Sequence, residues 1–110
     1  MEKIQNKLVR DNILDIIIND GKKPISRILD NEEYKYELKK KFNEELLELF
    51  EANNSNDIKS ELSDILELLI SYGNLNNISL NDIIAKADSK RLTNGSFNNK
   101  IFLEKVITNE

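Results

Sequence analysis

The sequence predicts an all-α protein, a bundle of about four helices, and three observations support this prediction. Glycine occurs three times and proline once, so the two residues that most disfavour helix interiors are rare. Apolar residues recur at helical spacing over several long segments, and residues typical of helix caps separate these segments. The chain has 110 residues, the length of one domain, so we expect a single domain over residues 1–110.

The boundary signals of the first half predict two helices separated by an extended segment. A first helix is expected over about 8–19, with Gly21 as its C-terminal stop. The only proline and the alternating pattern after it indicate a short extended segment over 24–29. Asp30 precedes an acidic first turn, so it is expected to cap a long helix over about 31–52.

The second half has the signals of two further helices. The polar run 53–57 indicates a turn and an N-cap, followed by a helix over about 58–72 that should stop near Gly73. Ser79 has an acidic residue three positions later, which predicts a capping box and a fourth helix to about residue 91. The remaining residues are expected to form a loop over 92–99 and a strand or ordered extended tail over 101–107.

Composition excludes several classes of chemistry. The chain contains no Cys, which excludes disulfides, iron–sulfur clusters and thiolate catalysis. It contains no His, which excludes a Ser-His-Asp triad and a His-ligated zinc site. No apolar run is long enough for a membrane span, and the N-terminus lacks the apolar stretch of a signal peptide, so we expect a cytoplasmic protein without a membrane partner.

Charge is distributed unevenly along the chain. The net charge of −4 argues against a nucleic-acid polymer as partner. Residues 42–67 contain eight acids and one basic residue, a net charge of −7, so the rest of the chain carries +3. An acidic centre with basic flanks is suited to holding a cation and a polyanion together, although solvated helix faces would show the same pattern.

Two pairs of acids carry the most information about function. Glu45/Glu48 and Glu61/Asp64 are each three residues apart, so each pair shares one helix face. On a helical wheel both pairs lie in or beside the apolar stripe that should face the core. Carboxylates gathered between helices repel one another, and the nearby Lys41 cannot neutralise four of them. The alternative is that these acids are ordinary surface residues with partners on their own helices.

The ligand chemistry points to a hard cation. Oxygen ligands without His or Cys suit Mg²⁺, Mn²⁺ or Ca²⁺. Mg²⁺ usually binds through a few carboxylates together with waters and substrate phosphates. The residues therefore support the hypothesis of metal-assisted attack of water on a phosphoanhydride.

The acidic motifs also resemble those of a known family. Glu44-Glu45-Leu46-Leu47-Glu48 followed by Glu61-Leu62-Ser63-Asp64 resembles the EExxE…ExxD pattern of MazG-like nucleotide pyrophosphohydrolases, members of the all-α NTP pyrophosphatase superfamily. The flanking segments resemble the branch described as phosphoribosyl-ATP pyrophosphohydrolase-like. They are Asn6–Asp11, Lys22–Ile25, Arg27–Asp30, Lys90-Arg91, Gly95, Phe97 and Ile101–Leu103.

The resemblance implies a helical bundle that cleaves a nucleoside triphosphate between its α- and β-phosphates, with Mg²⁺ or Mn²⁺ as cofactor. It implies metal ligation by Glu45, Glu48, Glu61 and Asp64. It assigns catalytic roles to Glu44, as an outer acid or water-activating base, to Glu45 and to Lys41. It makes Arg10, Lys90 and Arg91 candidates for contact with substrate phosphates.

Two other functions remain open from the sequence. One is hydrolysis of phosphoribosyl-ATP, and the other is a non-catalytic assembly or regulatory module that keeps the metal site. The resemblance implies a homodimer or homotetramer. Apolar residues outside the main stripe, Leu47 and Phe50, favour the same expectation, since a small bundle would not need them for its own core.

Overall fold

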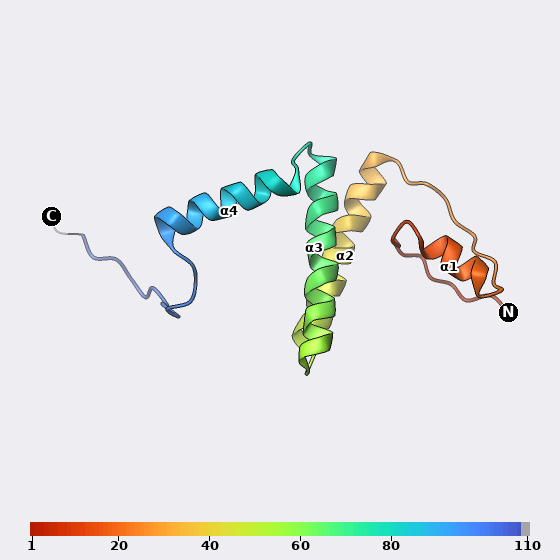
Figure 1. Ribbon diagram of the computed structural model, residues 1–110, viewed down its shortest axis with the longest axis horizontal. Coiled ribbons are helices and arrows are strands. Elements are labelled where there is room, and N and C mark those ends of the chain that lie inside the picture. Colours follow the sequence, from red (N-terminus) through yellow and green to blue (C-terminus); the bar gives the residue numbers. More distant parts are fainter. Residues whose placement is uncertain (109–110) are drawn as a thin grey trace.

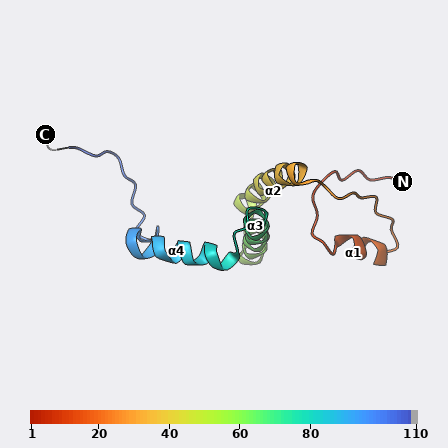
Figure 2. The same ribbon diagram turned by 90° about the horizontal axis from the view of Figure 1, so that it is seen from above.

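The computed structural model describes residues 1–108, in which there are four α-helices and no strand. They are α1 (Ile13–Asn19), α2 (Asn31–Glu51), α3 (Ser55–Leu75) and α4 (Leu80–Asn94). The predicted all-α class and the number of helices are confirmed. Helices α2 and α3 lie side by side as a hairpin, and α1 and α4 lie on opposite sides of it (Figure 1). The view from above has the same arrangement (Figure 2).

Helix α1 is shorter than predicted. The helix was expected from residue 8, but it begins at Ile13, whose backbone N–H donates to the Arg10 carbonyl at 3.1 Å. Asp11 and Asn12 precede it, and such residues favour turns over helix interiors because their side chains compete for backbone hydrogen bonds. The predicted stop at Gly21 is confirmed. Gly21 has φ +79°, and the N–H of Lys22 donates to the Ile17 carbonyl, as in a Schellman motif.

The long hairpin begins and turns at two polar caps. Asp30 caps α2 as predicted, because its carboxylate accepts a hydrogen bond from the Glu33 backbone N–H at 2.8 Å. Helix α3 begins at Ser55, three residues earlier than expected. The amide oxygen of Asn54 accepts from the Asp57 N–H at 2.9 Å, so Asn54 is the cap and the turn between α2 and α3 is short.

Helix α3 ends at Leu75, two residues beyond the predicted stop near Gly73, and the left-handed residue after its end is Asn77, with φ +60°. A Cβ at Gly73 would lie 2.8 Å from the Ile78 carbonyl oxygen and 3.1 Å from the Ile83 side chain. Glycine is therefore required at this position for the close approach of α4 to α3, and not for helix termination.

Helix α4 begins as predicted and ends later. Ser79 and Asp82 form a complete capping box, and the helix runs to Asn94 instead of Arg91. Gly95 follows it with φ +83°. Segments 24–29 and 101–107 lie outside the helices, and neither pairs in a sheet within the described range.

The hydrophobic core is thin and lies between α2 and α3. Leu38 is the one apolar side chain that is fully buried among the described residues, and Phe42 packs edge-on against Tyr72 with ring centroids 6.2 Å apart. The radius of gyration is 19.3 Å, whereas a compact chain of this length has about 13 Å. The single chain is therefore open, and much of its apolar surface is exposed.

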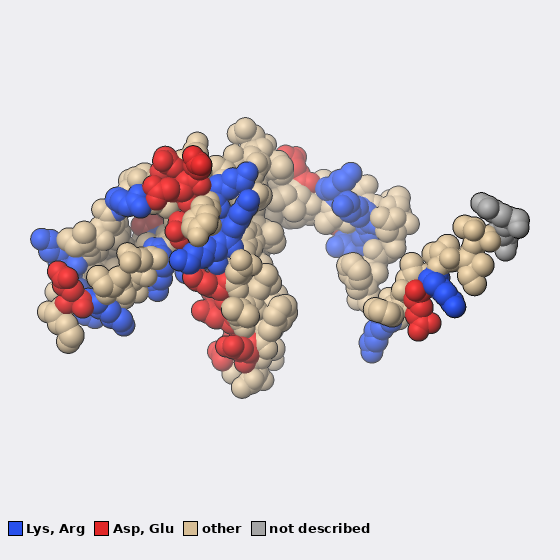
Figure 3. Space-filling view, turned by 180° about the vertical axis from the view of Figure 1, so that it is seen from behind, with Lys and Arg blue, Asp and Glu red and all other residues tan. Residues whose placement is uncertain are grey.

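The hairpin has two different sides. Acidic side chains gather on the side toward the N-terminal segment, and the side toward α4, here called the apolar side, shows residues without charge (Figure 3). Exposed side chains on this apolar side are Leu46, Phe50, Leu62, Leu66 and Leu69. No helix in residues 1–108 combines the length and apolar character that crossing a membrane requires.

Candidate metal centre

The acidic side of the hairpin brings together carboxylates that are distant in the sequence. Glu45 comes from the middle of α2, and Glu61 and Asp64 come from successive turns of α3. One carboxylate oxygen from each of the three lies within 4.8 Å of the others. Glu48, one turn after Glu45, is more exposed and is not a member of this trio, although it lies close enough to influence the ionisation of Glu45.

Burial gives the cluster unusual electrostatics. The Glu45 side chain is only 9% exposed, and one oxygen of Glu45 and one of Glu61 are buried without a hydrogen-bond partner. The pKa of Glu45 is raised to about 7. Desolvation is the largest cause, and the nearby Glu61, Glu48 and Asp64 carboxylates contribute to the same rise. A buried carboxylate oxygen without a partner is costly, so the site is stabilised by any cation that these oxygens can bind.

Two cationic side chains border the cluster. The Arg10 guanidinium donates to Asp64 Oδ1 at 2.7 Å, and the Lys41 ammonium lies 3.9 Å from both Glu44 and Glu45. With Glu44 and Glu48 beside the trio, carboxylates outnumber these two cationic side chains. The oxygen-only donors and their burial fit a hard divalent cation such as Mg²⁺ or Mn²⁺.

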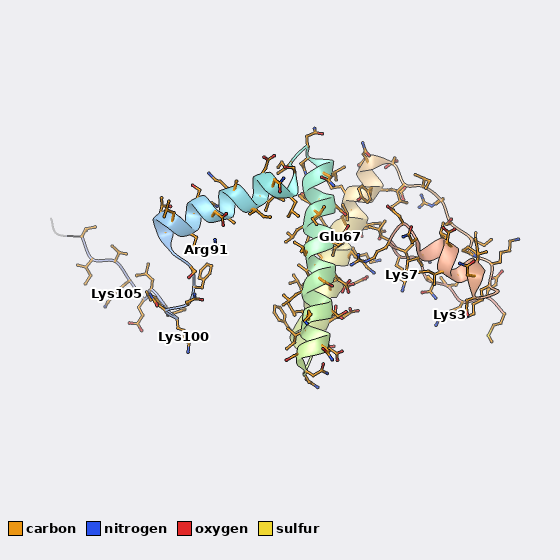
Figure 4. The ribbon with its side chains drawn as sticks, viewed as in Figure 1. Lys3, Lys7, Glu67, Arg91, Lys100 and Lys105 are labelled. Atoms are coloured by element: carbon orange, nitrogen blue, oxygen red, sulfur yellow. The ribbon has the colours of Figure 1, made fainter. Side chains whose placement is uncertain are left out.

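The other predicted site residues are divided between the two ends of the molecule. Glu44 lies beside the cluster, half-buried, in contact range of Lys41. Lys90 and Arg91 lie on α4, which projects away on the opposite side of the hairpin (Figure 4). Arg91 pairs there with Asp88 at 2.7 Å. One chain therefore brings Arg10, Lys41 and Glu44 to the four predicted ligands, but it does not bring Lys90 or Arg91.

Sequence reasoning missed the ion pair between Arg10 and Asp64. Arg10 was predicted as a phosphate contact, whereas here it binds one of the predicted metal ligands across 54 positions of the sequence. No local pattern signals such a contact, because the N-terminal segment reaches Asp64 only after α2 and α3 have paired.

Comparison with known proteins agrees with this geometry. The family model described as phosphoribosyl-ATP pyrophosphohydrolase matches residues 14–91, which include α2, α3 and all four predicted ligands. No curated protein and no solved structure gave a significant match. The match covers more than half of the chain, and it agrees with the paired acidic motifs and the all-α fold. The chain therefore belongs to the phosphoribosyl-ATP pyrophosphohydrolase family, within the MazG-like all-α NTP pyrophosphatase superfamily, and is a hydrolase that acts on phosphoric anhydride bonds.

Proposed function

We propose that this protein hydrolyses the bond between the α- and β-phosphates of a nucleoside triphosphate in an Mg²⁺-dependent reaction, in which Mn²⁺ can replace Mg²⁺. The products are a nucleoside monophosphate and pyrophosphate. One observation carries the proposal: Glu45 and Glu61 direct buried, unpartnered oxygens into a cluster with Asp64, in a chain of a pyrophosphohydrolase family.

The ligands of the cation would be Glu45, Glu61 and Asp64, with Glu48 as the fourth. When bound, Mg²⁺ polarises phosphoryl oxygens and lowers the pKa of an attached water. Because a pKa of about 7 leaves Glu45 partly protonated near neutral pH, binding of the cation would release a proton, and its affinity would rise with pH.

The side chains around the cluster would complete the reaction. The water oxygen forms a bond to phosphorus as the bridging P–O bond breaks, and the Glu44 carboxylate takes the proton. Lys41, 3.9 Å from Glu44 and Glu45, lies where it can contact a phosphate as well. Arg10 also borders the cluster, and its planar guanidinium suits phosphate oxygens.

Phosphoribosyl-ATP is the second candidate substrate, because the matching family carries its name. It contains the same triphosphate, so the catalytic groups would have the same roles. A non-catalytic module that retains the metal site is the alternative outside the enzymes. We place the reaction in the cytoplasm, where nucleoside triphosphates are abundant.

We further propose that the protein acts as a homodimer or homotetramer in which a second copy covers the apolar side. Leu62 is 52% and Phe50 is 78% exposed on that side, and the single chain is open. Water-exposed apolar surface of this extent favours association. An oligomer would also give Lys90 and Arg91 a route to the cluster of a neighbouring copy, as the predicted phosphate role requires.

The decisive experiment measures pyrophosphate release from ribo- and deoxynucleoside triphosphates and from phosphoribosyl-ATP, with Mg²⁺ and with a chelator. Metal-dependent release from common nucleotides supports the first candidate, and release from phosphoribosyl-ATP alone supports the second. If a folded protein that binds Mg²⁺ releases no pyrophosphate from any substrate, the chain is the non-catalytic module and the proposal is wrong.

A further inference from the structure

The N-terminal segment, residues 1–12, makes a single polar contact with the hairpin. Among the described residues, the bond from Arg10 to Asp64 at 2.7 Å is the one hydrogen bond or ion pair that joins this segment to α2 or α3. Helix α1, which follows the segment, makes no close backbone approach to any other helix in the described range. The position of the segment therefore depends on whether Arg10 stays paired with Asp64.

Asp64 has two competing uses. It belongs to the carboxylate trio that fits a divalent cation, and it already binds a monovalent cation, the Arg10 guanidinium. A divalent cation within the trio would lie beside that guanidinium, and the two like charges would repel each other. The ion pair is also weak enough to exchange, because the two side chains are 56% and 35% exposed and water screens their attraction.

On the basis of the proposed function, we propose that Arg10 changes partner during the reaction. Arg10 neutralises Asp64 in the metal-free protein, and it leaves Asp64 for a substrate phosphate when Asp64 ligates the cation. Arg10 is thus a positioning residue for Asp64 before the metal binds and a phosphate contact afterwards.

The geometry supports the second half of this exchange. The guanidinium binds Asp64 through one nitrogen, so its other donors are available for a phosphate. Arg10 is 56% exposed, and its partner Asp64 belongs to the trio with Glu45 and Glu61, so a phosphate bound to a cation in the trio would lie close to the guanidinium. Its backbone carbonyl accepts the first bond of α1 at 3.1 Å, so the segment that carries Arg10 is joined directly to the start of α1.

Calorimetry of Arg10→Gln separates this exchange from a purely structural role. With Mg²⁺ alone, the variant should bind about two- to fivefold more tightly than the wild type, because a weak competing ion pair has been removed. With Mg²⁺ and inorganic pyrophosphate, it should bind pyrophosphate about tenfold more weakly, because a charge-assisted contact is lost. A structural role would weaken both equilibria.

Two variants control the comparison. Arg27→Gln removes an equally short ion pair, with Glu33 at 2.7 Å, that involves no predicted ligand, so it should change neither affinity. Arg10→Lys keeps the charge and serves if Arg10→Gln does not fold. It should bind Mg²⁺ like the wild type and pyrophosphate more weakly, because an ammonium lacks the paired donors.

Hydrogen exchange provides the second readout. Mg²⁺ should speed amide exchange in residues 8–12 of the wild type and should have no such effect in Arg10→Gln. Equal or weaker Mg²⁺ affinity in Arg10→Gln overturns the proposed change of partner by Arg10 while leaving the metal site intact. Failure of the wild type to bind Mg²⁺ overturns the proposed function, and with it the proposed change of partner.

Discussion

The two sides of the α2–α3 hairpin are built from neighbouring positions of the same helices, yet they differ in composition. One side contains the carboxylates of Glu45, Glu61 and Asp64, which burial and mutual repulsion prepare for a cation. The other side leaves the apolar side chains of Leu46, Phe50, Leu62, Leu66 and Leu69 exposed to water. The same two helices therefore present two surfaces of different chemistry, one suited to binding a cation and the other suited to association.

The largest expected effect is on the acidic side. Glu61→Gln removes a ligand charge without changing side-chain shape, so turnover should fall by at least about a hundredfold while Mg²⁺ binding is lost. Pyrophosphate release and calorimetry measure the two effects, and light scattering should give the same molecular mass as for the wild type.

Glu67→Gln is the matched control for this variant. It makes the same chemical change on α3, but Glu67 is exposed and lies outside the carboxylate cluster (Figure 4). Full turnover in a folded Glu61→Gln protein would show that the metal assignment is wrong.

The next effect tests the apolar side. Leu66→Glu places a charge in the exposed apolar surface, so the dissociation constant of the oligomer should rise about a hundredfold. Light scattering over a concentration series measures this change, and Mg²⁺ affinity should stay close to that of the wild type. A wild-type chain that is monomeric at micromolar concentration would contradict the proposed association.

A smaller effect follows from the pKa of Glu45. Because its folded-state pKa of about 7 lies above the unfolded value, Glu45 favours the folded state fully at pH below about 4, and this contribution is lost as the pH rises to 7. In chelator, the free energy of unfolding should fall by about 2–3 kcal/mol across this range relative to Glu45→Gln.

Denaturant unfolding at several pH values measures this difference. With Mg²⁺ present the trend should weaken, because cation binding replaces the proton. Parallel pH profiles for wild type and Glu45→Gln in chelator would mean that Glu45 is not buried among carboxylates.

The smallest effect concerns the corner between α3 and α4. Gly73→Ala adds a Cβ that would lie 2.8 Å from the Ile78 carbonyl oxygen, so α4 must shift, at a cost of about 1–2 kcal/mol in stability. Thermal unfolding measures the loss. Mg²⁺ affinity should be unchanged, since this corner is remote from the acidic cluster, and a matching loss of affinity would contradict the separation of the two sides.

Much of the fold could be predicted because its signals are local. Asp30, Ser79 and Gly21 act on backbone groups within a few residues of themselves, and all three predicted caps are present. The helix bounds that differed from prediction have local causes at Asp11, Asn12 and Asn54 and a packing cause at Gly73. Gly73 has the appearance of a helix stop, but it is there because Ile78 and Ile83 pack closely against it.

The candidate site divides in the same way. The sequence by itself determined the carboxylate pairs, because residues three apart on a helix share a face and the motif spacing is local. Tertiary structure alone decided which of them meet: Glu45, Glu61 and Asp64 converge, and Glu48 lies beside them. Tertiary structure also decided that Arg10 pairs with Asp64 and that Lys90 and Arg91 lie on the far side of the hairpin. Contacts between distant segments depend on helix packing, which no local spacing encodes.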